Sequence, residues 1–292
     1  MPELPEVETI VRGLRTVLPG RTIVSVRLGK TDFIEDPLAL AEQLPGRRIE
    51  KVERMGKFIS VELSAGLEAK NPERQFDLVI HLGMTGWLGV RRPADPVAPH
   101  THAFFELENG HELRYTDIRR FGQILLVSAE GKGAFSERLG REPLEISAGE
   151  FSKVLGDRRA RIKALLLDQR IFRGIGNIYA DESLWQARIH PARLAARLNQ
   201  AELARLRTAI RHVLQHAIRD RGSSISNFVD AEGRPGEYQQ RHRAYGREGK
   251  PCFRCGTKIK REVIAGRSSF FCPRCQQRPR STSTRSRRRP TA

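Results

Sequence analysis

Two groups of residues in this sequence could do chemistry, and they stand at opposite ends of the chain. Near the C-terminus, Cys252 and Cys255 form one Cys-x-x-Cys pair, and Cys272 and Cys275 form a second pair after sixteen intervening residues. Each pair places two thiolates on one tight turn, and two such turns complete a tetrahedral zinc site. Because four thiolates leave no position for water, the spacing predicts one structural Zn²⁺.

The second group is the N-terminal Met1-Pro2-Glu3. If Met1 is removed, Pro2 carries a free secondary amine beside the carboxylate of Glu3, just ahead of a helix. The helix dipole lowers the pKa of such an amine and leaves more of it neutral and nucleophilic. Its attack on a sugar carbon would give an iminium, which is covalent amine catalysis. Taken alone, the same residues have a simpler interpretation as the start of an ordinary amphipathic helix.

The elements that must position these groups follow from hydrophobic periodicity. Apolar residues at helical spacing predict an N-terminal helix with Pro5 in its first turn and a C-cap at Gly20. Apolar and polar residues alternate in several short stretches of 22–127, which predicts short strands, and Asn109-Gly110 predicts a hairpin turn. Short strands at such spacing are typical of a β-sandwich or barrel. Residues 128–150 are loop-like. Helical patterns then cover 160–169, 178–187 and 203–217, and a long mobile loop is expected over 226–250.

Charge gives the strongest global signal. The 292 residues, enough for about two domains, include 52 Lys and Arg against 34 Asp and Glu, for a net charge of +18. This excess predicts a polyanionic partner, most simply nucleic acid. The tail 278–292 holds six Arg and no acid, and we expect it to be disordered. No hydrophobic run approaches the length of a membrane span, and the four clustered cysteines fit a reducing compartment.

Several single residues suit nucleic-acid contacts, although each has a plainer interpretation. Arg267 is expected at the tip of a β-hairpin between the Cys pairs, where it suits a phosphate. The Gly-rich turn ending at Asn177 could bind phosphate at a helix N-terminus, or Asn177 could simply be the N-cap. By pattern alone, Lys57 is a surface lysine, and Met84 and Phe121 belong to the core.

Four motifs occurring in this order resemble those of bacterial formamidopyrimidine-DNA glycosylases: Pro2–Glu8, His81–Gly86, Gly176–Glu182 and Gly266–Gln276. The resemblance runs from Pro2 to about Gln276. It implies an α+β multidomain fold: an N-terminal catalytic β-sandwich with its leading helix (1–135), a helix-two-turn-helix DNA-binding domain (150–235) and a four-cysteine zinc-finger β-hairpin (242–277). The basic tail 278–292 lies beyond it.

The resemblance also implies an activity. Such an enzyme excises oxidised purines, 8-oxoguanine and formamidopyrimidines, from duplex DNA through a Schiff base on Pro2, and then nicks the strand by β,δ-elimination as an apurinic or apyrimidinic site lyase. By motif position, the catalytic residues are the nucleophile Pro2, the acid Glu3, Lys57 and Arg267. The DNA-binding residues are His81, Met84, Arg119, Phe121, Lys163, Asn177 and Arg267.

Within that second set, His81, Asn177 and Arg267 match contacts to phosphates that flank the flipped nucleotide. Lys163 matches a lysine near the lesion pocket. Met84, Arg119 and Phe121 match residues that fill the gap and read the estranged base, so for Met84 and Phe121 the resemblance reverses the core interpretation. It further implies a bacterial, cytoplasmic and nucleoid-associated monomer that acts on damaged double-stranded DNA and has no membrane partner.

Two alternatives stay open at this point. A sister class resembling endonuclease VIII uses the same nucleophile on oxidised pyrimidines, but Leu4, where that class more often has Gly, favours the purine enzyme. A non-catalytic zinc-finger DNA-binding protein is the other, and intact Pro2, Glu3 and Lys57 count against it. The sequence departs from the family pattern at Ile118, where Pro is more common, and base contacts in 226–245 cannot be assigned.

Overall fold

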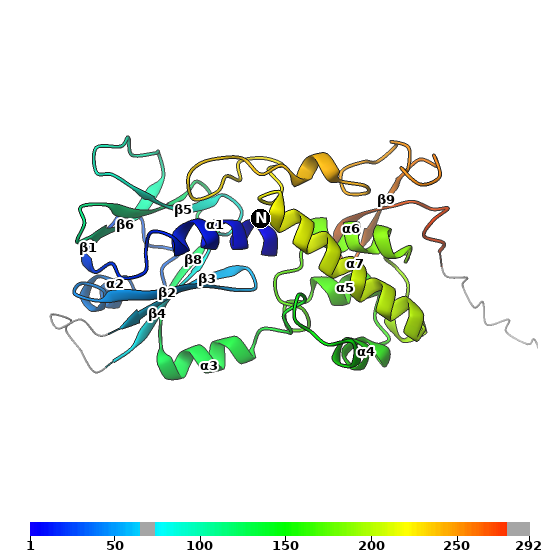
Figure 1. The fold of residues 1–292 in the computed structure, drawn as a ribbon, viewed down its shortest axis with the longest axis horizontal. Helices are drawn as coiled ribbons and strands as arrows, with labels where there is room; N and C mark the ends of the chain where they lie inside the picture. The colour runs from blue at the N-terminus through cyan, green and yellow to red at the C-terminus, as the bar shows by residue number, and fades with distance from the viewer. Residues whose placement is uncertain (65–73, 279–292) are drawn as a thin grey trace, which may run out of the picture.

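A computed structural model describes residues 1–64 and 74–278. The tail predicted to be disordered, 278–292, therefore lies outside the described residues except for Arg278. The molecule has two halves, a strand-rich N-terminal half and a helical C-terminal half that carries the Cys hairpin at its outer edge (Figure 1). The N-terminus lies at the centre, between the halves. The predicted α+β multidomain fold is confirmed.

The N-terminal half is a sandwich of two four-stranded antiparallel sheets, ordered β1-β6-β7-β5 and β2-β3-β4-β8. Apolar side chains of both sheets, among them Val61 and Phe105, share one buried cluster. The predicted hairpin at Asn109-Gly110 joins β6 to β7, and Gly110 has the positive φ of +76° that such a turn needs. The strands are β1 Ile23–Leu28, β2 Arg48–Met55, β3 Phe58–Ser64, β4 Phe76–His81, β5 Gly86–Arg91, β6 Thr101–Leu107, β7 Glu112–Asp117 and β8 Gln123–Ser128.

The C-terminal half packs its helices around a second, separate apolar cluster. Its largest helices, α6 and α7, form the centre, and the β9–β10 hairpin lies against α6. The elements of this half are α4 Ala148–Gly156, α5 Ile162–Leu167, α6 Asn177–Ala187, α7 Gln200–Arg219, the short 3-10 helices Ala195–Arg197 and Tyr238–Arg241, and the strands β9 Lys260–Ile264 and β10 Arg267–Phe271. The preceding helix, α3 Ala129–Glu137, packs against β4 and β8 of the sandwich.

Helix α1 (Leu4–Arg15) belongs to both halves. Leu4 is buried in the helical cluster, whereas the later apolar residues, Val7 to Leu14, are buried in the sandwich cluster. The predicted start of the helix is confirmed, but its predicted end is wrong: Thr16 is the C-cap, and Gly20, with φ of +86°, lies in the turn beyond it. Apolar spacing continued past the helix because Leu18 is also buried.

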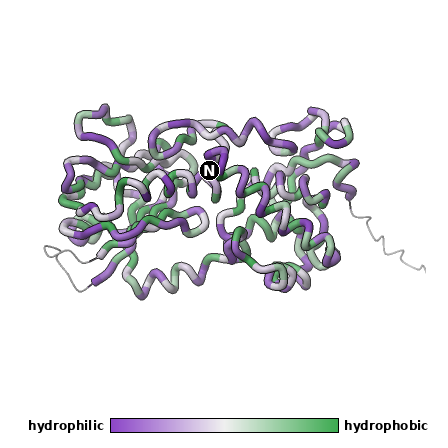
Figure 2. Tube along the Cα trace, viewed as in Figure 1, coloured by the Kyte–Doolittle hydropathy of each residue, from purple (hydrophilic) through white to green (hydrophobic). Residues whose placement is uncertain are grey.

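The loop predicted over 128–150 is wrong as well, because α3 occupies residues 129–137 and α4 begins at Ala148. A sequence signal for α4 was available: Ser147 and Glu150 form a capping box. The segment 226–250 is largely hydrophilic (Figure 2) and mostly irregular, as predicted, yet Tyr238 and Ala244 within it are buried. Helix α2 (Pro37–Gln43), capped by Asp36, was not predicted.

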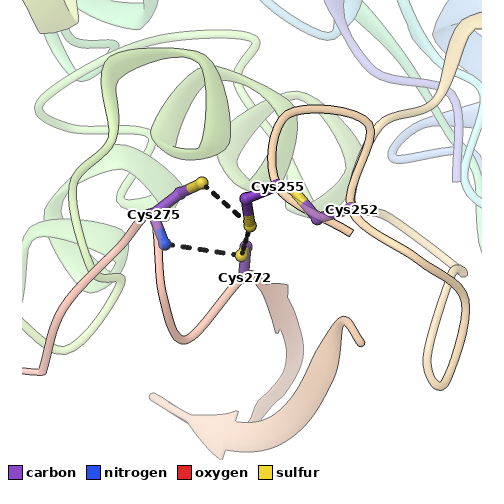
Figure 3. Close-up of side chains that lie close together, drawn as sticks. All are labelled: Cys252, Cys255, Cys272 and Cys275. Atoms are coloured by element: carbon purple, nitrogen blue, oxygen red, sulfur yellow. Dashed lines mark hydrogen bonds between the residues drawn. The ribbon is translucent and has the colours of Figure 1, made fainter. Parts of the chain in front are cut away.

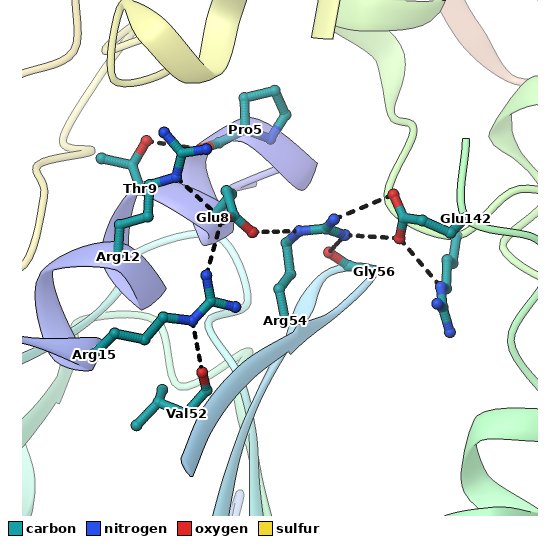
Figure 4. A network of polar contacts seen from close by, with 10 residues as sticks. Pro5, Glu8, Thr9, Arg12, Arg15, Val52, Arg54, Gly56 and Glu142 are labelled. Carbon is teal, nitrogen blue, oxygen red and sulfur yellow. Dashed lines mark hydrogen bonds and ion pairs between the residues drawn. The ribbon is translucent and has the colours of Figure 1, made fainter. Parts of the chain in front are cut away.

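A network of buried ion pairs joins the two halves on one side of α1 (Figure 4). The guanidinium of Arg54, at the end of β2, binds Glu142 in the linker between the halves through two contacts of 3.1 Å. The same guanidinium donates to Glu8 of α1 at 3.0 Å, and Arg173 binds Glu142 at 3.2 Å. One arginine therefore connects the sandwich, α1 and the linker.

Replacing Arg54 by Ala should lower the free energy of unfolding by about 3–5 kcal/mol, because the buried Glu142 loses its two-contact partner and Glu8 loses one of its three arginines. Urea unfolding followed by circular dichroism measures this. Arg92→Ala is the matched control: Arg92 pairs with Asp95 at 2.9 Å, but its side chain is 73% exposed, so its loss should cost only about 0–1 kcal/mol. Equal losses in the two variants would contradict the assignment.

Candidate functional site

A cavity of about 500 Å³ opens at the N-terminus, between the two halves. Six of the residues singled out from the sequence line it together: Pro2, Glu3, Lys57, Met84, Asn177 and Arg267. They come from the residues just before α1, the β2–β3 turn, the loop before β5, the start of α6 and the start of β10. The other four, His81, Arg119, Phe121 and Lys163, are within the described part of the chain but outside this lining.

The carboxylate of Glu3 organises the floor of the cavity. It accepts hydrogen bonds from the backbone N–H groups of Ile178 at 3.0 Å and Tyr179 at 3.3 Å, and so caps α6 from another part of the chain. A Cβ on Gly176 would lie 2.3 Å from Glu3 Cδ, so this approach requires glycine. Asn177 is not the N-cap: it is the first residue of α6, and its Nδ2 donates to Ser268 O at 3.0 Å.

A second buried carboxylate, Glu6, stands behind the first. It accepts from the N–H of Glu3 at 2.8 Å, from the N–H of Ser223 at 2.7 Å and from the hydroxyl of Tyr179. Nothing in the sequence pattern distinguished Glu6 from an ordinary first-turn acid, because two of its partners, Tyr179 and Ser223, lie more than 170 residues away.

Burial shifts the pKa values of four groups that line the cavity: the terminal amine, Glu3, Glu6 and Lys57. Burial raises the pKa of Glu3, although Lys57 and the two α6 N–H groups oppose it. Burial and the neighbouring Glu3 raise the pKa of Glu6 to about 7. Burial also lowers the pKa of the terminal amine and of Lys57. Burial therefore shifts each of these groups towards its neutral form, a protonated acid or a neutral amine, which are the forms that acid and nucleophilic catalysis use.

Lys57 is positioned by a turn rather than exposed on the surface. Only 7% of it is accessible, which excludes the surface-lysine interpretation. Gly56 before it has a φ of +64°, and a Cβ there would lie 2.9 Å from Arg173 Cβ and 3.2 Å from Gly174 N. The β2–β3 turn therefore packs directly on the segment that leads to α6.

Two loops that pack against each other, one between β4 and β5 and one between β7 and β8, carry exposed apolar side chains beside the cavity. Met84 is 44% exposed and Phe121 is 56% exposed, so the core interpretation of both is wrong. The guanidinium of Arg119 lies 4.4 Å from the centre of the Phe121 ring. A Cβ on Gly83 (φ +59°) would lie 2.4 Å from the carbonyl carbon of Phe121, which shows how closely the loops pack.

A residue that sequence reasoning missed, Asp117, ties these loops together. Its fully buried carboxylate accepts from Thr85 Oγ1 at 2.6 Å and from the N–H of Gly122 at 2.9 Å. Nearby, burial lowers the pKa of His81 to about 4. The Nδ1 of this neutral histidine accepts from the N–H of Gly83 at 3.2 Å, which leaves Nε2–H as its donor.

Lys163 lies behind the Cys hairpin. It is fully buried, pairs with Asp181 at 2.7 Å and donates to Ser268 O at 2.9 Å. Asp181 in turn accepts from the N–H of Phe270 at 2.9 Å. This ion pair, together with Asn177, holds β10 at the residues that follow the exposed Arg267. Asp181 is a second residue that sequence reasoning missed.

The four cysteines converge at the far end of that hairpin (Figure 3). Their sulfur atoms all lie within 4.8 Å of one another, and those of Cys255 and Cys272 are 3.5 Å apart. A tetrahedral shell with Zn–S bonds of about 2.3 Å separates its sulfurs by about 3.8 Å, so this donor set fits zinc. No other group of three or more ligand residues emerges within 1–64 and 74–278.

Known proteins match this chain along its length. Three family models cover successive segments: formamidopyrimidine-DNA glycosylase N-terminal domain at 1–124, formamidopyrimidine-DNA glycosylase H2TH domain at 139–229, and zinc finger found in FPG and IleRS at 249–278. The last match and the sulfur geometry together identify a structural zinc. In the described ranges, no helix has the length and apolar character needed to cross a membrane.

Relatives that match over their full length are formamidopyrimidine-DNA glycosylases as well. Formamidopyrimidine-DNA glycosylases of Pelotomaculum thermopropionicum and Heliobacterium modesticaldum are 45% and 47% identical, and the matches cover 95% of this chain and 99% and 100% of theirs. A solved complex between a mutant Lactococcus lactis FPG and a Fapy-dG containing DNA has a TM-score of 0.86 at 33% identity, covering 95% of this chain and 100% of that one. A complex of the same protein with an abasic site containing DNA has a TM-score of 0.85, again at 33% identity, covering 94% of this chain and 100% of that one.

Removing the zinc should unfold the finger locally, because such small modules take their folding free energy from the metal. Trp185 reports on this, since it packs with the finger's own small core, which includes Ile259. In a Trp87→Phe background, a zinc chelator should shift Trp185 emission to the red, and added zinc should reverse the shift. Unchanged emission from protein shown to have lost its metal would contradict this prediction.

The Glu6 carboxyl should make stability depend on pH. Its pKa of about 7 in the folded protein lies above its ordinary value of 4.5. Its stabilising contribution to the free energy of unfolding is therefore complete below about pH 4.5 and is lost as the pH rises through 7. The difference in unfolding free energy between wild type and Glu6→Gln should therefore fall by up to about 3 kcal/mol over this interval. Because the zinc site titrates equally in both proteins, a pH-independent difference would contradict the prediction.

Proposed function

The chain belongs to the formamidopyrimidine-DNA glycosylase family and excises oxidised purines from DNA, and from this premise we propose that Pro2, freed of Met1, is the nucleophile. One observation carries the proposal: the terminal residues, Glu3 and Lys57 line the same cavity. Burial lowers the pKa of the terminal amine there, and Pro2, which lines the same cavity, would carry the terminal amine once Met1 is removed.

In the proposed reaction, the damaged nucleotide is flipped out of the duplex into the cavity. The lone pair of the Pro2 nitrogen attacks C1′, and the N-glycosidic bond breaks with its electrons passing to the base, which takes up the proton that the Pro2 nitrogen loses, so that the nitrogen regains its lone pair. Glu3 then gives its proton to the ring oxygen as the C1′–O4′ bond breaks, and the nitrogen lone pair forms the iminium. The raised pKa of Glu3 supports this acid role.

We further propose a lyase activity at apurinic or apyrimidinic sites. The iminium is an electron sink, so loss of the C2′ proton expels the 3′ phosphate, and a second elimination expels the 5′ phosphate. Lys57, whose pKa burial lowers, would assist at the DNA backbone beside the sugar. Arg267, exposed at the start of β10, would bind a flanking phosphate and hold the sugar in place during both eliminations.

The DNA contacts in this proposal use the rim of the cavity. Asn177 and the neutral imidazole of His81 bind phosphates, while Met84, Phe121 and Arg119 fill the gap left by the flipped nucleotide; the exposure of Met84 and Phe121 supports this. Lys163 is fully buried, so it would act on DNA indirectly, by holding the hairpin that carries Arg267.

The proposal also covers the domain boundaries and the binding partner of the protein. Separate apolar clusters in the two halves support units at 1–135 and 150–235, with the finger at 242–277. Damaged double-stranded DNA bound by a monomer in the bacterial cytoplasm remains our expectation. The full-length formamidopyrimidine-DNA glycosylase relatives disfavour the alternative sister class, and the assembled N-terminal cavity disfavours a non-catalytic DNA-binding protein.

Replacing Glu3 by Gln tests both steps. Excision of 8-oxoguanine opposite cytosine should fall by about 10²–10⁴-fold, the usual loss when a general acid is removed. Trapping on an abasic duplex with borohydride should persist, because the sugar of an abasic site opens to an aldehyde without help from Glu3. Gel shift under denaturing conditions measures the trapped complex, after mass spectrometry has established that Met1 is absent.

The exposed Glu137→Gln variant serves as the control, and thermal unfolding checks that Glu3→Gln still caps α6. Excision at the wild-type rate by Glu3→Gln would remove Glu3 from the mechanism. Wild-type protein that excises the base yet leaves no borohydride-trapped complex would refute the Pro2 nucleophile.

A further inference from the structure

A short turn from the C-terminal half is lodged in the sandwich of the N-terminal half. The chain leaves α7, crosses above α1 towards β5 and returns (Figure 1). At the far point, residues 230–234 close on themselves: the N–H of Asp230 donates to Arg234 O at 2.9 Å, and the N–H of Gly233 donates to Asp230 O at 3.0 Å. The buried Asp230 carboxylate also accepts from the N–H of Arg234 at 2.8 Å, so the turn is rigid in itself.

Two glycines form a socket for this turn. Ala231 is buried among the apolar residues of the sandwich. A Cβ on Gly89 of β5 would lie 2.5 Å from Ala231 O, and a Cβ on Gly13 of α1 would lie 3.0 Å from Ala231 Cβ. Both glycines sit in regular strand or helix and neither has a positive φ. Glycine is therefore needed at both positions for space, not for backbone conformation.

Polar contacts from β5 fasten the turn in the socket. The indole N–H of Trp87 donates to Asp230 O at 2.8 Å, and Arg91 Nη1 donates to Ala231 O at 3.1 Å. The Arg91 guanidinium also lies 4.4 Å from the centre of the Trp87 ring, so the two donors support each other. Two backbone carbonyls of the turn are thus satisfied by side chains of the other half.

The segment before the turn forms a wall of the cavity. It begins at Ser223, whose N–H is fixed by Glu6 at 2.7 Å. Between that point and the turn, Ile225, Ser226 and Phe228 line the cavity, and Ile225 is 54% exposed. This wall is anchored in the helical half at one end and in the sandwich at the other.

We infer that Gly13, Gly89, Trp87 and Arg91 are positioning residues for excision: they hold the turn 230–234 so that residues 225–228 stand against the flipped base. The inference rests on the proposed entry of the damaged nucleotide into this cavity. Residues of the N-terminal half would therefore set the position of the base-binding wall, although the wall itself belongs to the C-terminal half of the chain. A nucleotide without a base makes no contact with this wall, so displacing the wall should not weaken the binding of abasic DNA.

Gly89→Ala tests the inference, because the added methyl group displaces the turn. Excision of 8-oxoguanine in single turnover should fall about tenfold or more, as expected when a positioning contact shifts by about an ångström. Trp87→Phe keeps an aromatic ring at this position but removes the indole N–H and its hydrogen bond to Asp230 O, and excision should fall about fivefold. Both variants should bind a duplex containing a tetrahydrofuran abasic analogue within about twofold of wild type, since no base contact is lost.

Gly149→Ala is the matched control, because a Cβ there meets nothing within 4 Å; it should leave both measurements unchanged. Normal excision by Gly89→Ala, or parallel losses of excision and abasic binding, would overturn the inference. If Gly89→Ala does not fold, the same two measurements on Trp87→Phe decide whether the inference holds. Failure of wild-type protein to release 8-oxoguanine would instead refute the proposed function.

Discussion

The structure depends on two carboxylates, Glu3 and Glu6, being buried together at the N-terminus. A buried carboxylate costs several kcal/mol unless hydrogen bonds and opposite charge compensate it. Here the compensation comes from both halves: α6 supplies backbone N–H groups to Glu3, Ser223 supplies one to Glu6, and Lys57 of the sandwich supplies positive charge. The two acids can therefore be buried only when the halves are docked, so the site and the domain arrangement form together.

The halves also exchange parts, which keeps the cavity walls in register. The first turn of α1 places Leu4 in the helical cluster, and the 230–234 turn places Ala231 in the sandwich cluster. The N–H of Leu4 donates to Gly174 O at 3.0 Å, next to the turn that carries Lys57. Movement between the halves would disturb the terminal amine, the lysine and the wall at the same time. Preorganisation of this kind reduces the entropic cost of reaching the reactive geometry.

How much the sequence could predict depended on whether the signal was local. Alternating strands, the Asn109-Gly110 turn and the Cys pairs were predicted because neighbouring residues specify them. The end of α1 was wrong because burial of Leu18 extends the apolar pattern beyond the helix, and α4 was missed although its capping box is local. Glu6, Asp117 and Asp181 could not be found from pattern, since their partners converge only after folding. The resemblance reached Met84 and Phe121, which periodicity alone assigned wrongly to the core.

The finger shows why a structural metal serves a site it does not touch. Its apolar core is small, with Trp185, Ala244 and Ile259 its main members besides cysteine, too little to hold a hairpin in one orientation. Zinc fixes one end of the hairpin, and the Lys163–Asp181 pair fixes its backbone at Ser268 and Phe270. A buried ion pair adds little net stability, but its geometry admits few alternatives. Arg267 thus projects from a hairpin held at both ends, and it lines the cavity at a place set by the zinc and by α6.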